Sequence, residues 1–294
     1  MPATYTHHLF TKDVYKVIDE SVKKKIESSK DVYELFGKSF DNLFFSNFHL
    51  GNYAHNHFTN LYFKNIIKFI KENNLENDSQ VLAYLYGSIC HYVLDSTIHP
   101  YVYYKTGDYH RKNRMTKKYM GKHDYLEYMI DSILYEERNN KPIYKAKLSK
   151  EMFPKINFNE SLKLAIDYTL LNTFAEKNGS QQIIKGYRNF KFIMKHGMTS
   201  RFGIKARIYS FIDFTKLLNS KKLRNCCYYI KKLDKSVLNL EHKKWVYPVD
   251  KKINFHYSFY DLYDISIEKA RKLINEIDFA LNKNDKDLNK VIRM

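Results

Sequence analysis

Three side chains able to bind a metal ion follow one another at four-residue intervals: His91, Asp95 and His99. They end an almost wholly apolar run that begins at Asp78, a typical helix N-cap, and we expect this helix to end before Pro100. Four-residue spacing places the three side chains on one helix face. Burying an imidazole and a carboxylate without partners is costly, so the segment indicates either a bound metal ion or a hydrogen-bonded His-Asp pair in a helical core.

The N-terminal half of the chain supplies further imidazoles and carboxylates. Nine of the 12 histidines lie within the first 123 residues, and His123 and Glu127 repeat the four-residue spacing. Imidazoles and carboxylates without thiolates favour zinc in a catalytic setting, where one coordination position stays open to water. The candidate ligands are His7, Asp41, His55, His91, Asp95, His99, His123 and Glu127, with His8 and His57 as alternatives to His7 and His55.

Long helices must position these residues, because only 9 glycines and 5 prolines interrupt a chain of 294 residues. We predict an all-α fold, a single multi-helix domain over residues 1–294 with a metal-binding cleft in its N-terminal half. Residues 1–138 carry the candidate ligands, and residues 155–294 form a packing or lid half. Apolar periodicity predicts helices over residues 5–28, 52–73, 78–99, 121–138, 158–175, 181–196, 201–220, 222–238 and 257–282, with a basic, aromatic loop over 100–120.

The charge and the cysteines restrict the partners and the compartment. A net charge of +18 favours anionic partners such as phosphate esters, nucleic acid or anionic lipid. Three cysteines, of which Cys226 and Cys227 are adjacent, do not make a disulfide framework. The N-terminus lacks the basic and apolar regions of a signal peptide, and no apolar run is long enough for a transmembrane segment. We therefore expect a basic cytoplasmic protein.

Five motifs contain the candidate ligands: Thr6-His7, Gly37-Lys-Ser-Phe-Asp41, His55 fourteen residues later, Tyr84-Leu-Tyr-Gly-Ser-Ile-Cys-His-Tyr-Val-Leu-Asp-Ser-Thr-Ile-His-Pro100, and His123-Asp-Tyr-Leu-Glu127. Together they resemble the zinc-dependent phospholipase C family, whose helical architecture is shared with the fungal zinc nucleases that cut single-stranded nucleic acid. The short interval between Asp95 and His99 is similar to that in an intracellular branch of the family. The resemblance implies an all-helical phosphodiesterase with three zinc ions in one cleft.

The resemblance also implies a distribution of ligands among the ions. It assigns one zinc to Asp41, His55, His91 and Asp95, and a second to His99, His123 and Glu127. The third ion would use His7, with Asp95 as a bridging ligand. In the secreted enzymes a processed N-terminal tryptophan completes this third site, whereas the present chain begins Met-Pro-Ala, so we expect two to three zinc ions.

The expected chemistry is hydrolysis of a phosphodiester by a metal-bound hydroxide. Asp41 is the candidate general base as well as a ligand, because a carboxylate at the mouth of the site could orient the attacking water. Asp131, one turn beyond Glu127, has two interpretations: an acceptor for the imidazole of a ligand, or a helix-face carboxylate paired with a lysine.

Substrate and partners stay open at the level of sequence. The tyrosines and cations between residues 100 and 122 suit a nucleotide-like substrate, a phospholipid headgroup, peripheral contact with an anionic membrane, or a solvated loop. The adjacent His123-Asp124 suggests an HD-type phosphohydrolase as a competing enzyme. A non-catalytic helical protein that binds nucleic acid or anionic membrane is the alternative from another class, and the sequence does not determine the oligomeric state.

Overall fold

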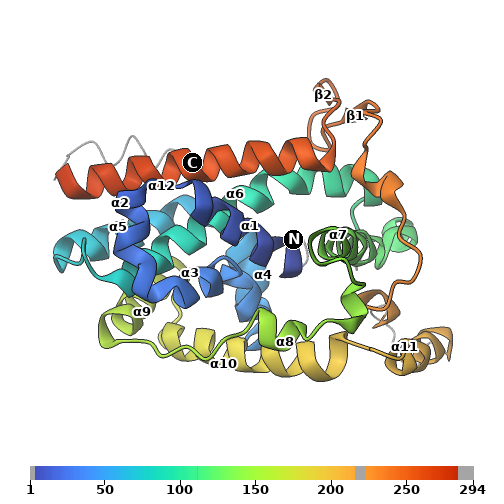
Figure 1. Cartoon of the computed structure of the whole chain (residues 1–294), viewed down its shortest axis with the longest axis horizontal. Helices are drawn as coiled ribbons and strands as arrows, with labels where there is room; N and C mark the ends of the chain where they lie inside the picture. The colour runs from blue at the N-terminus through green and yellow to red at the C-terminus, as the bar shows by residue number, and fades with distance from the viewer. Residues whose placement is uncertain (1–3, 111, 216–222, 284–294) are drawn as a thin grey trace. The chain divides into compact units, whose positions relative to one another are not determined.

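The computed structural model describes residues 4–110, 112–215 and 223–283. The structure is 73% helical and has almost no strand, which confirms the predicted all-α class (Figure 1). The only strands within these ranges are the two-residue segments β1 (Trp245–Val246) and β2 (Asn254–Phe255), which pair antiparallel. The α-helices are α1 (Thr4–Val17), α2 (Glu20–Ile26), α3 (Lys30–Phe36), α4 (Phe48–Asn56), α5 (Thr59–Glu72), α6 (Ser79–Thr106), α7 (Lys122–Asn139), α8 (Leu148–Glu151), α9 (Glu160–Phe174), α10 (Gly179–Ile193), α11 (Ile204–Thr215) and α12 (Phe259–Lys283).

The chain divides into two compact units, each assembled from several segments. The first unit contains residues up to Thr6 together with 94–151 and 192–266, and the second contains residues 7–93, 152–191 and those from 267 onward. Both units combine segments from the two sequence halves, so the expected ligand half and packing half do not correspond to the two units. The organisation as a single domain stays a prediction.

Two glycines allow three helices of the second unit to approach closely. A Cβ on Gly87 of α6 would lie 2.5 Å from the carbonyl oxygen of Tyr33 in α3. A Cβ on Gly37, which follows α3, would lie 2.0 Å from Oγ1 of Thr11 in α1. Both distances are shorter than any side-chain contact allows, so glycine is required at both positions. The approach brings the helices that carry His7 and His91 together.

The helix around the central motif begins where the sequence predicts and ends later. Oδ1 of Asp78 accepts hydrogen bonds from the backbone nitrogens of Gln80 and Val81, which confirms the predicted N-cap. The predicted end at Pro100 is wrong, because α6 continues to Thr106 with the proline inside it. Tyr101, directly after the proline, is fully buried, and this packing offsets the hydrogen bond that the proline removes.

Of the other predicted helices, the one over residues 52–73 is divided between α4 and α5 at His57 and Phe58, and most of the rest differ from the structure at their ends. The prediction over residues 5–28 is divided between α1 and α2, and the one over 201–220 is α11, with residues 216–220 outside the described ranges. The predicted helix over 222–238 is wrong: its described part contains two short 3₁₀ turns, η6 (Leu223–Cys226) and η7 (Lys235–Leu238), joined by irregular chain. The spacing of Lys and Tyr in this stretch resembles helical periodicity, but the segment packs against α7 instead, for example through the rings of Tyr228 and Tyr128.

Two sequence-based expectations concern the membrane and the cysteines. Among the described helices, none has the length and apolar character needed to cross a bilayer. No disulfide links Cys90, Cys226 and Cys227, all of which lie in the described part of the chain. The cytoplasmic location stays a prediction.

Candidate metal centre

The eight predicted ligands gather into three groups of donor atoms. The groups are His7, His91 and Asp95; Asp41, His55 and His91; and His99, His123 and Glu127. In each group the donor atoms lie within 4.8 Å of one another. Four tetrahedral ligands at about 2.1 Å from a zinc ion lie about 3.4 Å apart, so separations of this order are what a zinc site requires.

Asp41 is the carboxylate of a group that lies wholly within the second unit. It lies in the 3₁₀ segment η2 (Ser39–Phe45), and its Oδ1 is 3.1 Å from Nε2 of His55 and 4.0 Å from Nε2 of His91. Burial alone would raise the pKa of Asp41, but the nearby imidazoles of His91 and His55 outweigh it and hold the pKa below its usual value. The carboxylate is therefore ionised near neutral pH, as a metal ligand must be.

The orientation of His55 is fixed by a backbone carbonyl within its own helix. Nδ1 of His55 lies 2.7 Å from the carbonyl oxygen of Gly51, one turn earlier in α4. With Nδ1 directed at this carbonyl, Nε2 is the ring nitrogen left for a metal ion, and it lies 3.1 Å from Oδ1 of Asp41. Sequence reasoning missed this carbonyl: the four-residue interval to Gly51 is visible, but the direction of the imidazole is not.

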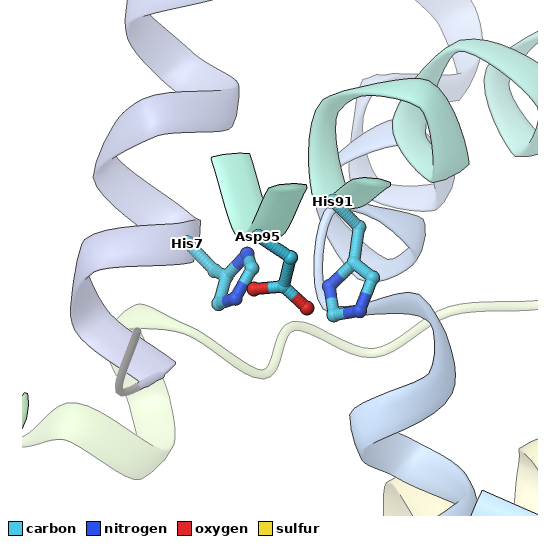
Figure 2. A group of neighbouring side chains, drawn as sticks. All are labelled: His7, His91 and Asp95. Carbon is cyan, nitrogen blue, oxygen red and sulfur yellow. The ribbon is translucent and has the colours of Figure 1, made fainter. Parts of the chain in front are cut away.

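His7 contributes to the group that contains Asp95. Its ring stacks on that of His91 with centroids 4.5 Å apart, and Asp95 follows His91 by one turn of α6. Figure 2 shows the three side chains, with His7 from α1 and the other two from α6. His91 therefore occurs in two groups, whereas the resemblance gave the bridging position to Asp95.

The third group lies wholly within the first unit and repeats the same pattern of donors. Oε1 of Glu127 is 2.8 Å from Nε2 of His123, one turn earlier in α7, and 3.8 Å from Nε2 of His99. Burial lowers the pKa of His123 to about 3 and also lowers that of His99, so both imidazoles are neutral near pH 7. Burial raises the pKa of Glu127. Neutral imidazoles beside one carboxylate are a donor set suited to zinc.

The structure separates the preferred histidines from their alternatives. His8 lies outside the three groups, with Nδ1 3.6 Å from Glu34, and burial together with Lys38 and Lys12 lowers its pKa to about 2. His57 also lies outside them and packs against Tyr53 with ring centroids 4.5 Å apart. The donor groups thus contain His7 and His55, the residues that the sequence analysis preferred.

Asp131 holds the start of α1. Its carboxylate accepts hydrogen bonds from the backbone nitrogens of Tyr5 (2.9 Å) and Thr6 (2.8 Å), from Oγ1 of Thr6 (2.6 Å) and from the hydroxyl of Tyr228 (2.5 Å). The predictions that Asp131 supports a ligand imidazole or pairs with a lysine are therefore wrong. It acts as an N-cap supplied by a distant helix, and it fixes the residues directly before His7.

The sequence analysis also missed Lys38, a buried residue three positions before Asp41. The side chain is fully buried, and Nζ donates a hydrogen bond to the carbonyl oxygen of Glu34 at 2.7 Å. Burial lowers the pKa of Lys38 to about 8, although the carboxylates of Glu34 and Asp41 act in the opposite direction. A lysine in a polar motif has no sequence signal that distinguishes it from the many surface lysines.

The lowered pKa of Lys38 predicts a specific dependence of stability on pH. Between pH 8 and the ordinary lysine pKa of 10.5, the unfolded chain binds more protons at Lys38 than the folded chain does. The free energy of unfolding therefore increases as the pH rises through this range. Because methionine carries no charge, Lys38→Met lacks this gain. We therefore expect the free energy of unfolding of Lys38→Met, measured relative to that of the parent protein, to fall by about 2 kcal/mol between pH 8 and pH 10. Urea unfolding at several pH values measures this, with the exposed Lys64→Met as control. A difference that stays constant with pH would contradict the prediction.

The comparisons with known proteins identify one family. The model of the family described as zinc dependent phospholipase C matches residues 6–177, more than half of the chain. This range contains all eight predicted ligands, most of α1 and the whole of the helices from α2 to α9. Searches of curated proteins and of solved structures found no match. Asp124, the second residue of the HD-type pair, lies outside the three donor groups.

Proposed function

Because the chain belongs to the zinc-dependent phospholipase C family, we propose that it is a zinc-dependent hydrolase of phosphodiester bonds with a phospholipid substrate. This proposal rests on the arrangement of imidazole and carboxylate donors in three groups. Within each group the donor atoms lie no more than 4.8 Å from one another. The basic composition, with a net charge of +18, agrees with a substrate that carries a phosphate.

We assign the ligands to ions by the groups they form. Asp41, His55 and His91 would hold one ion, and His99, His123 and Glu127 a second. His7 and Asp95 would serve a third, with His91 or Asp95 shared between ions. Bound zinc supplies Lewis-acid stabilisation of the phosphate oxygens and acidifies a water molecule.

The residues of the chain prepare the site for this chemistry in three ways. Asp41, whose pKa lies below its usual value, would accept the proton of the attacking water as general base. His99 and His123 are kept neutral by burial, so their ring nitrogens are available as donors. The Gly51 carbonyl fixes the tautomer of His55. Together these features keep the donors in their binding forms near neutral pH.

A nucleotide-like phosphodiester is the second candidate substrate, and one residue favours it. The ring of Tyr103 lies 5.2 Å from that of His123 and 5.7 Å from that of His99, and Tyr103 is exposed. An exposed aromatic ring beside a donor group is a surface on which a base can stack. The fungal zinc nucleases, which share the family architecture, cut single-stranded nucleic acid, so hydrolysis of single-stranded DNA is the reaction to compare with hydrolysis of a phospholipid.

One assay separates these functions. Zinc-loaded protein is tested against phosphatidylcholine, a soluble bis-aryl phosphate and single-stranded DNA, with metal content measured on the same sample. We expect two or three zinc ions per chain, hydrolysis of the bis-aryl phosphate and of phosphatidylcholine, loss of activity with a chelator and recovery with zinc. Preferential cleavage of DNA would favour the nucleotide substrate. Hydrolysis that survives complete removal of metal would contradict the proposal, and no hydrolysis with one zinc or none would favour the non-catalytic alternative.

A further inference from the structure

Helix α11 is attached to the first unit by one side only. Ala206 is buried, the hydroxyl of Tyr209 donates a hydrogen bond to the carbonyl oxygen of Gly197 at 3.0 Å, and the carboxylate of Asp213 accepts from the backbone nitrogens of Leu223 and Arg224 at 2.9 Å each. Positions 206, 209 and 213 are separated by three and four residues, so they share one helix face. This face anchors α11.

The opposite face of α11 is apolar and exposed. Ile204, Ile208 and Phe211 follow one another at four and three residues and define this face, with Phe214 at its edge. Phe211 is 64% exposed and Phe214 is 83% exposed. A helix that packs on a protein core normally has its apolar residues on the packed side, whereas α11 has them on the side away from it. We call Ile204, Ile208, Phe211 and Phe214 the outer face of α11.

The segment that leads into α11 adds apolar area. Phe192 and Phe202 are both exposed, the latter by 72%, and the guanidinium of Arg201 lies over the ring of Phe202 at 5.5 Å. A folded protein rarely exposes several large apolar side chains within so short a stretch unless they contact a partner. Isolated exposed apolar residues need no such explanation, but this accumulation does.

The charged side chains of residues 192–215, the segment that carries the outer face of α11, are positive with one exception. Residues 192–215 contain one acidic residue, Asp213, and both its oxygens are engaged by backbone nitrogens. Arg201 and Arg207 are exposed, and Nζ of Lys205 is bound to the carbonyl oxygen of Thr199. The same stretch also contains Lys195. Aromatic and aliphatic side chains flanked by exposed arginines are the composition of helices that lie in the interface of an anionic membrane.

We propose that the outer face of α11 docks this protein on an anionic phospholipid surface. The inference rests on the proposed function, since a phospholipid substrate is met at such a surface. A second copy of the chain is the less suitable occupant, because two molecules that each carry +18 and present exposed arginines around the same face repel one another. The apolar side chains enter the acyl boundary, and the arginines contact lipid phosphates.

The test compares the binding of zinc-loaded, full-length protein to two kinds of vesicle. Vesicles of phosphatidylglycerol with phosphatidylcholine are compared with vesicles of phosphatidylcholine alone, by co-sedimentation. We expect binding to the anionic vesicles, weakened by salt, and at least about tenfold weaker binding by the double variant Ile208→Ser, Phe211→Ser. Val249→Ser, which removes an exposed side chain elsewhere in the first unit, is the matched control and retains binding.

Three results would overturn the inference. They are equal binding by the double variant and the parent, no binding of the parent to anionic vesicles, and a dimer of the parent that the double variant abolishes in light scattering. Hydrolysis of the soluble bis-aryl phosphate is measured in parallel and is unchanged in the double variant. Soluble hydrolysis without vesicle binding would refute docking alone, whereas the absence of soluble hydrolysis would refute the proposed function itself.

Discussion

Replacing Asp41 by asparagine is expected to lower kcat/KM for a phosphodiester by at least about 10³-fold, which corresponds to about 4 kcal/mol of transition-state stabilisation. The physical reason is that Oδ1 of Asp41 faces both His55 and His91, so the change removes the only carboxylate of that donor group. It also removes the proposed general base. Steady-state kinetics with the soluble bis-aryl phosphate measures the loss, and metal analysis should show less zinc per chain.

The control for this variant is the same substitution at an aspartate that belongs to none of the three donor groups. Asp31→Asn changes an exposed carboxylate at the start of α3 in the same unit, and we expect its kcat/KM to stay within about twofold of the parent. The helical circular dichroism of both variants should match that of the parent, because asparagine has nearly the same volume as aspartate and neither change opens a cavity. Retention of full activity by Asp41→Asn would remove Asp41 from the site.

The second large effect is on stability. Asp131→Ala removes an acceptor of four hydrogen bonds and leaves the donors of Thr6 and Tyr228 buried without it, which we expect to lower the free energy of unfolding by about 3–4 kcal/mol. Asp131→Asn keeps an acceptor oxygen and should cost less. Burial raises the pKa of Asp131 to about 6, so the carboxylate is ionised at neutral pH and interacts favourably with the N-terminus of α1.

Urea unfolding at pH 7 measures the effect of Asp131→Ala. Glu136→Ala, an exposed carboxylate later in the same helix, should change the free energy of unfolding by no more than about 0.5 kcal/mol. Zinc content provides a second readout, since Asp131 holds the residues directly before His7. A loss of stability equal to that of Glu136→Ala would contradict the role of Asp131 as an N-cap for α1.

The residue types and intervals predicted which donor atoms come together in the candidate site, because helical spacing converts directly into geometry. His123 and Glu127, four residues apart, meet at 2.8 Å, as expected for one helix face. Contacts between segments far apart in sequence were harder to predict. Asp131 and Thr6 are 125 residues apart, and no local sequence pattern predicts that a side chain of α7 caps the N-terminus of α1.

The predicted helix bounds were wrong where local preference and tertiary packing disagree. Pro100 favours a helix end, yet burial of the following Tyr101 is worth more than the hydrogen bond that the proline removes. The helix predicted over residues 222–238 failed for a related reason. Its periodic side chains have specific partners instead, such as Tyr228, whose hydroxyl donates to Asp131. Periodicity cannot report such partners.

The donor sets have a consequence for electrostatic balance. The three donor groups together contain five imidazoles but only three carboxylates, those of Asp41, Asp95 and Glu127. Two or three divalent ions held there would bring four to six positive charges against at most three negative charges, which would leave a surplus in a poorly solvated place. A phosphodiester anion would reduce that surplus, whereas an uncharged ester would not. The small number of carboxylates in the donor groups would therefore favour an anionic ligand.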